Sequence, residues 1–198
     1  MCGIAGGIGP SAPSKFVLDN QLDSIKHRGP DDQGTYVNQG IALGMCRLAI
    51  VEIAAGKQPA SDERESIYLV FNGEIYNYRE LRTELEQRGV HCRDSSESEV
   101  VINLYLEFGL DFINKLNGMF AIAIHDSRDK SLHLIRDRMG KKPLWISQLN
   151  DGTLFFASEV RALMLARPDR TLRNDMVAEV MQYGYIDAPH SAFNEITQ

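Results

Sequence analysis

Short stretches of apolar and β-branched residues, separated by glycine and proline, dominate the N-terminal part of the chain and predict β-strands. A helix is predicted over residues 78–88, where Leu81 and Leu85 recur at helical spacing before Gly89. A second helix is predicted to begin at Ser96-Glu97-Ser98-Glu99, which fits a capping box, and to close at Gly109.

Strand patterns resume beyond the second helix, and two more helices are predicted over residues 159–166, with Ser158 as a cap, and 174–183. Strands are predicted over residues 2–8, 34–37, 41–53, 67–71, 119–125, 132–136, 144–147 and 154–156. This order of strands, helices and strands favours an α+β fold with antiparallel sheets and segregated helices over an alternating βαβ array.

Composition narrows the class of protein. The 198 residues suit one sizeable domain with a connector, and the net charge of −6 disfavours a nucleic-acid partner. No apolar run approaches the roughly 20 residues that span a bilayer, and the N-terminus lacks the basic region of a signal peptide, so we expect no membrane association. The three cysteines form no C-x-x-C pair, which predicts a reducing cytoplasm, with Cys46 as a core thiol and Cys92 as a loop thiol.

A cysteine stands directly behind the initiator methionine, at position 2. Removal of Met1 would leave one residue with both a thiol and a free α-amine. A thiol of pKa about 8.5 attacks well only as thiolate, and an α-amine of pKa about 7.7–8.0 can take its proton at neutral pH. Cys2 is therefore a candidate nucleophile with its own base, although an accidental cysteine before a first strand stays open on this pattern alone.

Arg47 lies within an almost wholly apolar strand pattern over residues 44–51. A guanidinium in such a strand either points to solvent or meets an anion, because burying an unpaired charge is very costly. The functional interpretation is a clamp for a substrate carboxylate, and an outward-facing strand residue is the alternative.

Three polar segments have a structural interpretation, and two of them also have a functional one. Asn72-Gly73-Glu74 between apolar runs favours a hairpin turn, but an Asn amide and a Gly N–H are also the donors of an oxyanion hole. The acidic residues 94–99 suit a helix N-terminus, or a carboxylate among them binds an ammonium group. The segment His27-Arg28-Gly29-Pro30-Asp31-Asp32 has the residues of a polar turn.

As an ordered set, these segments resemble the glutaminase domain of class II glutamine amidotransferases, in particular the asparagine synthetase branch. The resemblance runs from Met1 to about Leu163. It is carried by Met1-Cys2-Gly3-Ile4-Ala5-Gly6, His27-Arg28-Gly29-Pro30-Asp31, Arg47-Leu48-Ala49-Ile50-Val51, Gln58-Pro59, Phe71-Asn72-Gly73-Glu74-Ile75-Tyr76-Asn77, Leu116-Asn117-Gly118-Met119-Phe120-Ala121, Arg136-Asp137-Arg138-Met139-Gly140-Lys141-Lys142-Pro143-Leu144 and Ala157-Ser158-Glu159-Val160-Arg161-Ala162-Leu163.

The resemblance implies an N-terminal-nucleophile hydrolase fold, with two stacked antiparallel sheets between helical layers. It implies that Cys2, freed of Met1, attacks the side-chain amide of L-glutamine, and that water then releases glutamate from a thioester. Asn72 and the Gly73 N–H would hold the oxyanion, and Arg47 would bind the α-carboxylate of glutamine. The rest of the implied glutamine pocket consists of Ile50, Val51, Glu74 and Glu97. The resemblance also implies that His27 lines the wall between the active site and the ammonia exit, and a structural role is the alternative.

Glu97 departs from the usual pattern, because the family commonly places Asp at the position that binds the α-ammonium of glutamine. The charge is kept, but the side chain is one methylene, about 1.5 Å, longer. We expect binding to survive with a shifted pocket, with Asp94 as a second candidate for this contact.

The synthetase domain that follows the glutaminase domain in the family, with its ATP and Mg²⁺, has no counterpart here, because no Ser-Gly-Gly-x-Asp-Ser loop occurs. We expect a glutaminase domain over residues 2–166, and over residues 167–198 a helix and connector toward an ammonia-accepting synthetase domain or subunit. Asparagine made from aspartate is the expected product. No metal or other cofactor is expected in the glutaminase domain, and a homodimer is left open.

Two other function classes stay open on the sequence. A retained Met1 would block the α-amine and leave a catalytically silent glutamine-sensing or interaction domain. An amidase acting on another acyl donor is the second, although Arg47 with an acidic partner favours a free amino acid as substrate.

Overall fold

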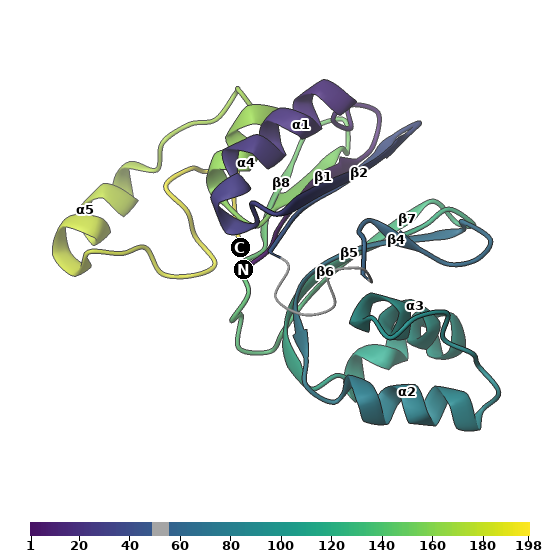
Figure 1. Ribbon diagram of the computed structural model, residues 1–198. Coiled ribbons are helices and arrows are strands. Elements are labelled where there is room, and N and C mark those ends of the chain that lie inside the picture. The colour runs from purple at the N-terminus through teal and green to yellow at the C-terminus, as the bar shows by residue number, and fades with distance from the viewer. Residues whose placement is uncertain (49–55) are drawn as a thin grey trace.

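Two antiparallel β-sheets stack face to face in the computed structural model, which describes residues 1–48 and 56–198 (Figure 1). Helices cover the outer face of each sheet, so that the chain forms four layers. The α+β class with two stacked sheets between helical layers, predicted from the sequence, is therefore confirmed.

The first sheet joins strands from both ends of the chain and has the order β2-β3-β1-β9-β8. Its strands are β1 (Gly3–Ile8), β2 (Asp32–Asn38), β3 (Ile41–Arg47), β8 (Trp145–Gln148) and β9 (Leu154–Ala157), and helices α1 (Lys15–Ser24) and α4 (Val160–Ala166) cover it. A 3-10 turn, η1 (Lys26–Arg28), follows α1.

The second sheet is formed by the middle of the chain and has the order β4-β5-β6-β7. Its strands are β4 (Ala60–Ser61), β5 (Ile67–Ile75), β6 (Gly118–Asp126) and β7 (Ser131–Arg136), covered by α2 (Tyr78–Gln87), α3 (Glu97–Phe108) and the 3-10 helix η2 (Gly109–Lys115). Helix α5 (Asn174–Tyr183) stands apart from both sheets in Figure 1.

Strand alternation divides the core into three apolar layers, one between the sheets and one under each set of helices. In β1, Ile4 faces the other sheet and Ala5 faces α1 and α4. In β5, Val70 faces the first sheet, whereas Leu69 and Phe71 pack against α3. The face of each strand residue can therefore be assigned by parity.

One helix was not predicted, and two local predictions are wrong. Helix α1 was not predicted, because Leu18 and Leu22 are the only large apolar residues on its buried side; Ser14 caps it by accepting from the Val17 N–H. Ser158 does not cap α4, because its Oγ accepts from the Ile4 N–H. Only one of the two contacts of the predicted capping box of α3 forms. Ser96 Oγ accepts from the Glu99 N–H, but the Ser96 N–H donates to Asp94 rather than to Glu99.

Candidate active site

Cys2 lies at the end of the interface between the two sheets. It directly precedes β1, and the register pairs Gly3 with Cys46, which places Cys2 beside Arg47 at the end of β3. Because Ile4 and Met45 face the other sheet, parity puts Cys2 and Arg47 on that same face. Cys2 is partly exposed and packs against the apolar layer between the sheets.

The backbone around Cys2 is held by residues far away in the sequence. Arg28 Nε donates to the Cys2 carbonyl oxygen at 2.9 Å, and Arg28 Nη1 forms an ion pair with Glu159 at 3.0 Å. Ser158 donates its N–H to the Ile4 carbonyl oxygen at 2.8 Å and accepts the Ile4 N–H at 2.9 Å. The turn η1 and the start of α4 therefore fix the position of the candidate nucleophile.

The contact of Arg28 with Cys2 was not predicted from the sequence, although Arg28 lies in the segment His27-Arg28-Gly29-Pro30-Asp31. The only signal was a guanidinium beside strong turn chemistry. The neighbouring His27 is half exposed, and its Nε2 lies 3.0 Å from Glu159, so both interpretations of His27 remain predictions.

The other two thiols are poorly suited to nucleophilic attack. Cys46 is fully buried and its Sγ lies 3.2 Å from the Leu22 carbonyl oxygen; burial raises the pKa of this thiol to about 11. Burial also raises the pKa of the Cys92 thiol. The predictions of a core thiol and a loop thiol agree with these positions, and Cys2 stays the candidate nucleophile.

Asn72 lies inside strand β5, opposite Ala121 of β6, so the hairpin turn favoured by its composition is wrong. It shares the parity of Val70 and therefore faces the sheet that carries Cys2. Its side chain is fully buried, and neither Oδ1 nor Nδ2 has a hydrogen-bond partner in the described structure. A buried amide without partners costs about 1–3 kcal/mol, and donors left open in this way suit a ligand.

The Gly73 N–H points to the open edge of β5. The flanking N–H groups of the same parity do not bond to β6: that of Phe71 donates to Gln58 Oε1 and that of Ile75 to Glu97 Oε1. Gly73 therefore forms a non-hydrogen-bonded pair with Phe120, and its N–H lies between these two contacts. A Cβ at Gly73 would lie 2.1 Å from the Met119 carbonyl oxygen, so the residue must be glycine.

Glu97 is the first residue of α3, and its Oε1 accepts the Ile75 N–H at 3.0 Å. Ile75 lies two residues beyond Gly73, about 7 Å along the strand, and both N–H groups point to the same edge. Glutamine has four bonds, about 5 Å, between its amide carbon and its α-nitrogen. The Glu97 carboxylate and the Gly73 N–H are thus spaced on the scale of a glutamine molecule.

Arg47 and Glu74 flank this edge. An ideal Cβ at Gly56 would lie 3.6 Å from Arg47 Nη2 and 3.5 Å from Ser96 Cβ, so Arg47 reaches the N-terminus of α3. Glu74 is exposed and shares the parity of Asn72. Ile50 and Val51, expected in the glutamine pocket, lie outside the described residues.

The family model described as "Glutamine amidotransferase domain" matches residues 1–198. The chain belongs to this family. Its membership confirms the resemblance noted in the sequence and the expectation of an enzyme of the amidotransferase class.

Curated relatives place this amidotransferase chain beside the asparagine synthetase branch. It is 35% identical over 194 residues to "Asparagine synthetase [glutamine-hydrolyzing] 1" of Bacillus subtilis, covering 96% of the chain and 30% of the relative. It is 39% identical over 168 residues to "Asparagine synthetase [glutamine-hydrolyzing] 2" of the same organism, covering 82% of the chain and 22% of the relative. The chain thus spans less than a third of the relatives it matches.

A solved structure shows the same fold at low identity. Glutamine phosphoribosylpyrophosphate amidotransferase of B. subtilis, complexed with ADP and GMP, matches with a TM-score of 0.67 and 22% identity, over 83% of the chain and 43% of that protein. This likeness supports the N-terminal-nucleophile hydrolase fold of the amidotransferase chain.

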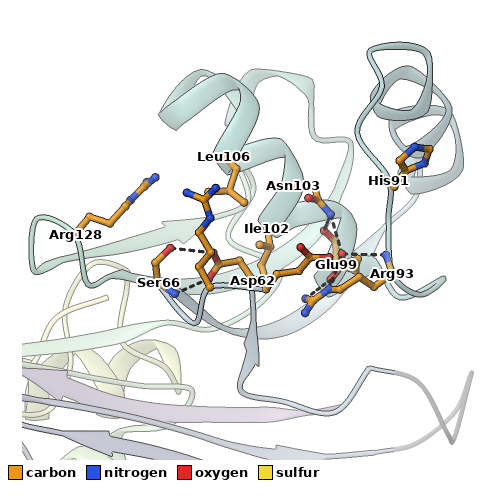
Figure 2. A pocket seen from close by; sticks show the side chains of 11 residues that line it. Asp62, Ser66, His91, Arg93, Glu99, Ile102, Asn103, Leu106 and Arg128 are labelled. Atoms are coloured by element: carbon orange, nitrogen blue, oxygen red, sulfur yellow. Dashed lines mark hydrogen bonds and ion pairs between the residues drawn. The ribbon is translucent and has the colours of Figure 1, made fainter.

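Two hollows lie on the helix side of the second sheet. One, of about 660 Å³, is lined by Asp62, Ser66, Arg93, Glu99 and Arg128, among others, near the β6–β7 turn (Figure 2). Asp126 at that turn pairs with Ile67, at the opposite end of β5 from Asn72, so this hollow is separate from the Cys2 site. The other, of about 370 Å³, is lined by Gly56, Ser96, Arg93 and Glu99, among others, and borders the site.

Within residues 1–48 and 56–198 the amidotransferase chain shows no group of three or more His, Cys, Asp or Glu side chains that could hold a metal ion. None of the helices in the described part of the chain is long and apolar enough to cross a membrane.

Proposed function

We propose that this amidotransferase chain hydrolyses L-glutamine to glutamate and ammonia through a thioester on Cys2. The observation that carries the proposal is the fully buried, unpartnered carboxamide of Asn72, which faces the sheet of Cys2. A strand residue whose polar atoms lack partners is expected where a ligand supplies them.

The reaction would begin once Met1 is removed. The α-amine of Cys2 takes the thiol proton, and Sγ adds to the amide carbon of glutamine. The oxyanion receives hydrogen bonds from Asn72 Nδ2 and the Gly73 N–H. The ammonium of Cys2 then protonates the leaving nitrogen, ammonia departs, and water hydrolyses the thioester to glutamate and free thiol.

Recognition of the amino-acid end would use the charges at the edge of β5. Arg47 suits the α-carboxylate, because a guanidinium binds a carboxylate bidentately. Glu97 suits the α-ammonium, since a carboxylate has about four acceptor sites and can accept the Ile75 N–H and an ammonium proton together. Glu74, Ile50 and Val51 complete the proposed pocket.

The ammonia would serve an ATP-dependent amide synthesis in a synthetase domain or subunit, with asparagine from aspartate as the product. The names of the relatives and their greater length support this part. So does α5, where only Met176 is buried and Val177, Val180, Met181 and Tyr183 are exposed. An apolar stripe at helical spacing on an exposed helix is expected to pack against a partner.

The test is an intact-mass spectrum before and after treatment with 6-diazo-5-oxo-L-norleucine, an electrophilic glutamine analogue. Loss of Met1 and one adduct mapped to Cys2 are expected, together with ammonia release from glutamine. Cys92→Ser serves as the matched control, because it removes a partly exposed thiol away from the sheet interface. A protein that begins at Cys2 and still takes no adduct would overturn the proposal.

A further inference from the structure

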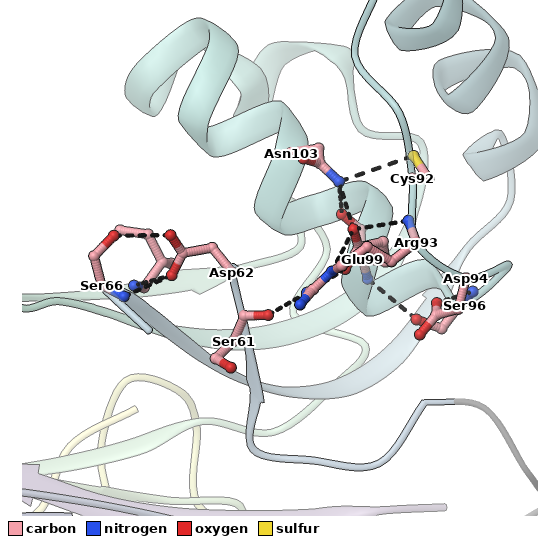
Figure 3. A network of polar contacts seen from close by, with 10 residues as sticks. Ser61, Asp62, Ser66, Cys92, Arg93, Asp94, Ser96, Glu99 and Asn103 are labelled. Atoms are coloured by element: carbon pink, nitrogen blue, oxygen red, sulfur yellow. Dashed lines mark hydrogen bonds and ion pairs between the residues drawn. The ribbon is translucent and has the colours of Figure 1, made fainter. Parts of the chain in front are cut away.

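Arg93, which is exposed, and Glu99, which is buried, form an ion pair beside, but outside, the site described above (Figure 3). Arg93 Nη2 lies 2.7 Å from Glu99 Oε2, and Arg93 Nε lies 3.2 Å from both carboxylate oxygens. The Arg93 N–H also donates to Glu99 Oε1, at 3.2 Å. The Glu99 side chain is only 6% exposed, whereas that of Arg93 is 41% exposed, so water screens the pair from the arginine side only.

This pair connects three elements of the chain. Arg93 belongs to the loop between α2 and α3, Glu99 to the first turn of α3, and Arg93 Nη2 donates to the carbonyl oxygen of Ser61 in β4. Asn103, one turn further along α3, donates to Glu99 Oε1 at 3.0 Å. Loop, helix and strand edge are thus fixed to one another through a single carboxylate.

The pair lies between the two hollows, because Arg93 and Glu99 line both of them. The apolar packing of α3 begins at Val100 and Val101, whereas Glu99 in its first turn borders both hollows. The bidentate Arg93–Glu99 pair adds charge-assisted hydrogen bonds at this first turn.

Glu97 is carried by the same helical turn as Glu99. Its contact with the Ile75 N–H sets the distance between α3 and β5, while Gln58 spans the same gap by accepting from Phe71 N–H and donating to Ser98 Oγ at 3.1 Å. Glu97 is one methylene longer than the usual aspartate, so its carboxylate is placed correctly only if the helix start is held in place.

We propose that Arg93 and Glu99 are positioning residues that set the Glu97 carboxylate for the α-ammonium of the substrate, and so select amides of α-amino acids. This inference rests on the proposed glutaminase function. Neither residue needs to touch the substrate, because the effect passes through the first turn of α3.

The experiment compares two ligands that differ only in the α-amino group. Glutaramate keeps the amide and the carboxylate of glutamine and lacks the amine. For wild type and Arg93→Ala, the KM and kcat for glutamine are measured, together with the inhibition constant of glutaramate against glutamine hydrolysis. We expect Arg93→Ala to raise the KM for glutamine about tenfold, as when a charged hydrogen bond is weakened, with kcat and the glutaramate constant within twofold of wild type.

Arg88→Ala is the matched control, because Arg88 also joins α3, at its other end, through Glu107 at 3.4 Å. It should leave both constants unchanged. Arg93→Lys, which cannot reproduce the planar bidentate contact, should fall between Arg93→Ala and wild type, and it replaces the alanine variant if that protein does not fold.

Equal weakening of both ligands by Arg93→Ala, or no change in either, overturns the inference while the glutaminase function stands. A wild-type protein that begins at Cys2 and hydrolyses no glutamine overturns the proposed function, and this inference with it.

Discussion

Replacing Asn72 by alanine should raise the stability of the protein and lower its glutaminase activity. In most strands, truncating a fully buried polar side chain breaks hydrogen bonds and destabilises the protein. Asn72 makes none in the described structure, although it is fully buried. Its carboxamide therefore destabilises the free protein, and we expect it to make favourable hydrogen bonds only when substrate is bound.

The magnitudes follow from that burial. Removing an unpartnered buried amide gains about 1–3 kcal/mol. The void left behind, roughly 30 Å³ or one water's share of the liquid, costs about 0.7 kcal/mol at about 24 cal/mol per Å³. The net change is a stabilisation of about 0.3–2.3 kcal/mol, and each kcal/mol raises Tm by about 2–4 °C in a domain of this size.

Activity should move in the opposite direction. Loss of one oxyanion donor costs about 10²–10³ in kcat, or about 2.7–4 kcal/mol of transition-state stabilisation. The assay pairs steady-state glutaminase kinetics with urea unfolding of the same preparations. Ala123→Ser, which adds a polar group on the same interface, is the control and should lower stability, because that hydroxyl enters a fully buried position. An Asn72→Ala protein that is destabilised by more than 1 kcal/mol, or that keeps kcat within threefold, would refute this reasoning.

Three further outcomes are expected. Gly73→Ala should destabilise by about 1–3 kcal/mol in urea unfolding, since the new Cβ would lie 2.1 Å from the Met119 carbonyl oxygen; an unchanged midpoint would contradict that contact. Arg28→Met should slow labelling of Cys2 by the diazo analogue at least tenfold, because the charged hydrogen bond to the Cys2 carbonyl oxygen is lost; unchanged labelling would show that this bond does not position the nucleophile. Burial raises the pKa of the Asp137 carboxyl, but backbone N–H donors outweigh it and hold the pKa below its usual value. Its stabilisation is therefore present above pH about 4 and lost as pH falls further, and Asp137→Ala should flatten acid unfolding in that range.

Much of the chemistry and most of the elements were determined by the sequence alone. A cysteine at position 2 needs no tertiary contact to carry both thiol and potential α-amine. Helices α2 and α3 follow from local periodicity with Gly89 and Gly109 at their ends, which is short-range information. The class of fold followed from the order of strands and helices, because segregated elements limit the ways in which apolar faces can be covered.

The conformation of Asn72-Gly73 was decided only by tertiary structure. Its composition favours a turn, but pairing with β6 on both sides of the segment keeps β5 continuous through Ile75. The face on which Asn72 lies, and the edge to which the Gly73 N–H points, follow from that register rather than from residue type.

The contacts that hold the site together were likewise beyond sequence reasoning. Arg28 forms an ion pair with Glu159, which lies 131 residues further along the chain. The Ile4 N–H donates to Ser158 Oγ, which lies 154 residues further along. From the sequence Ser158 could cap the following helix, but in the structure its Oγ accepts from the backbone N–H of Ile4 in β1. Local patterns predict which residues can form hydrogen bonds, but the choice of partner depends on which segments the fold brings within 3 Å of one another.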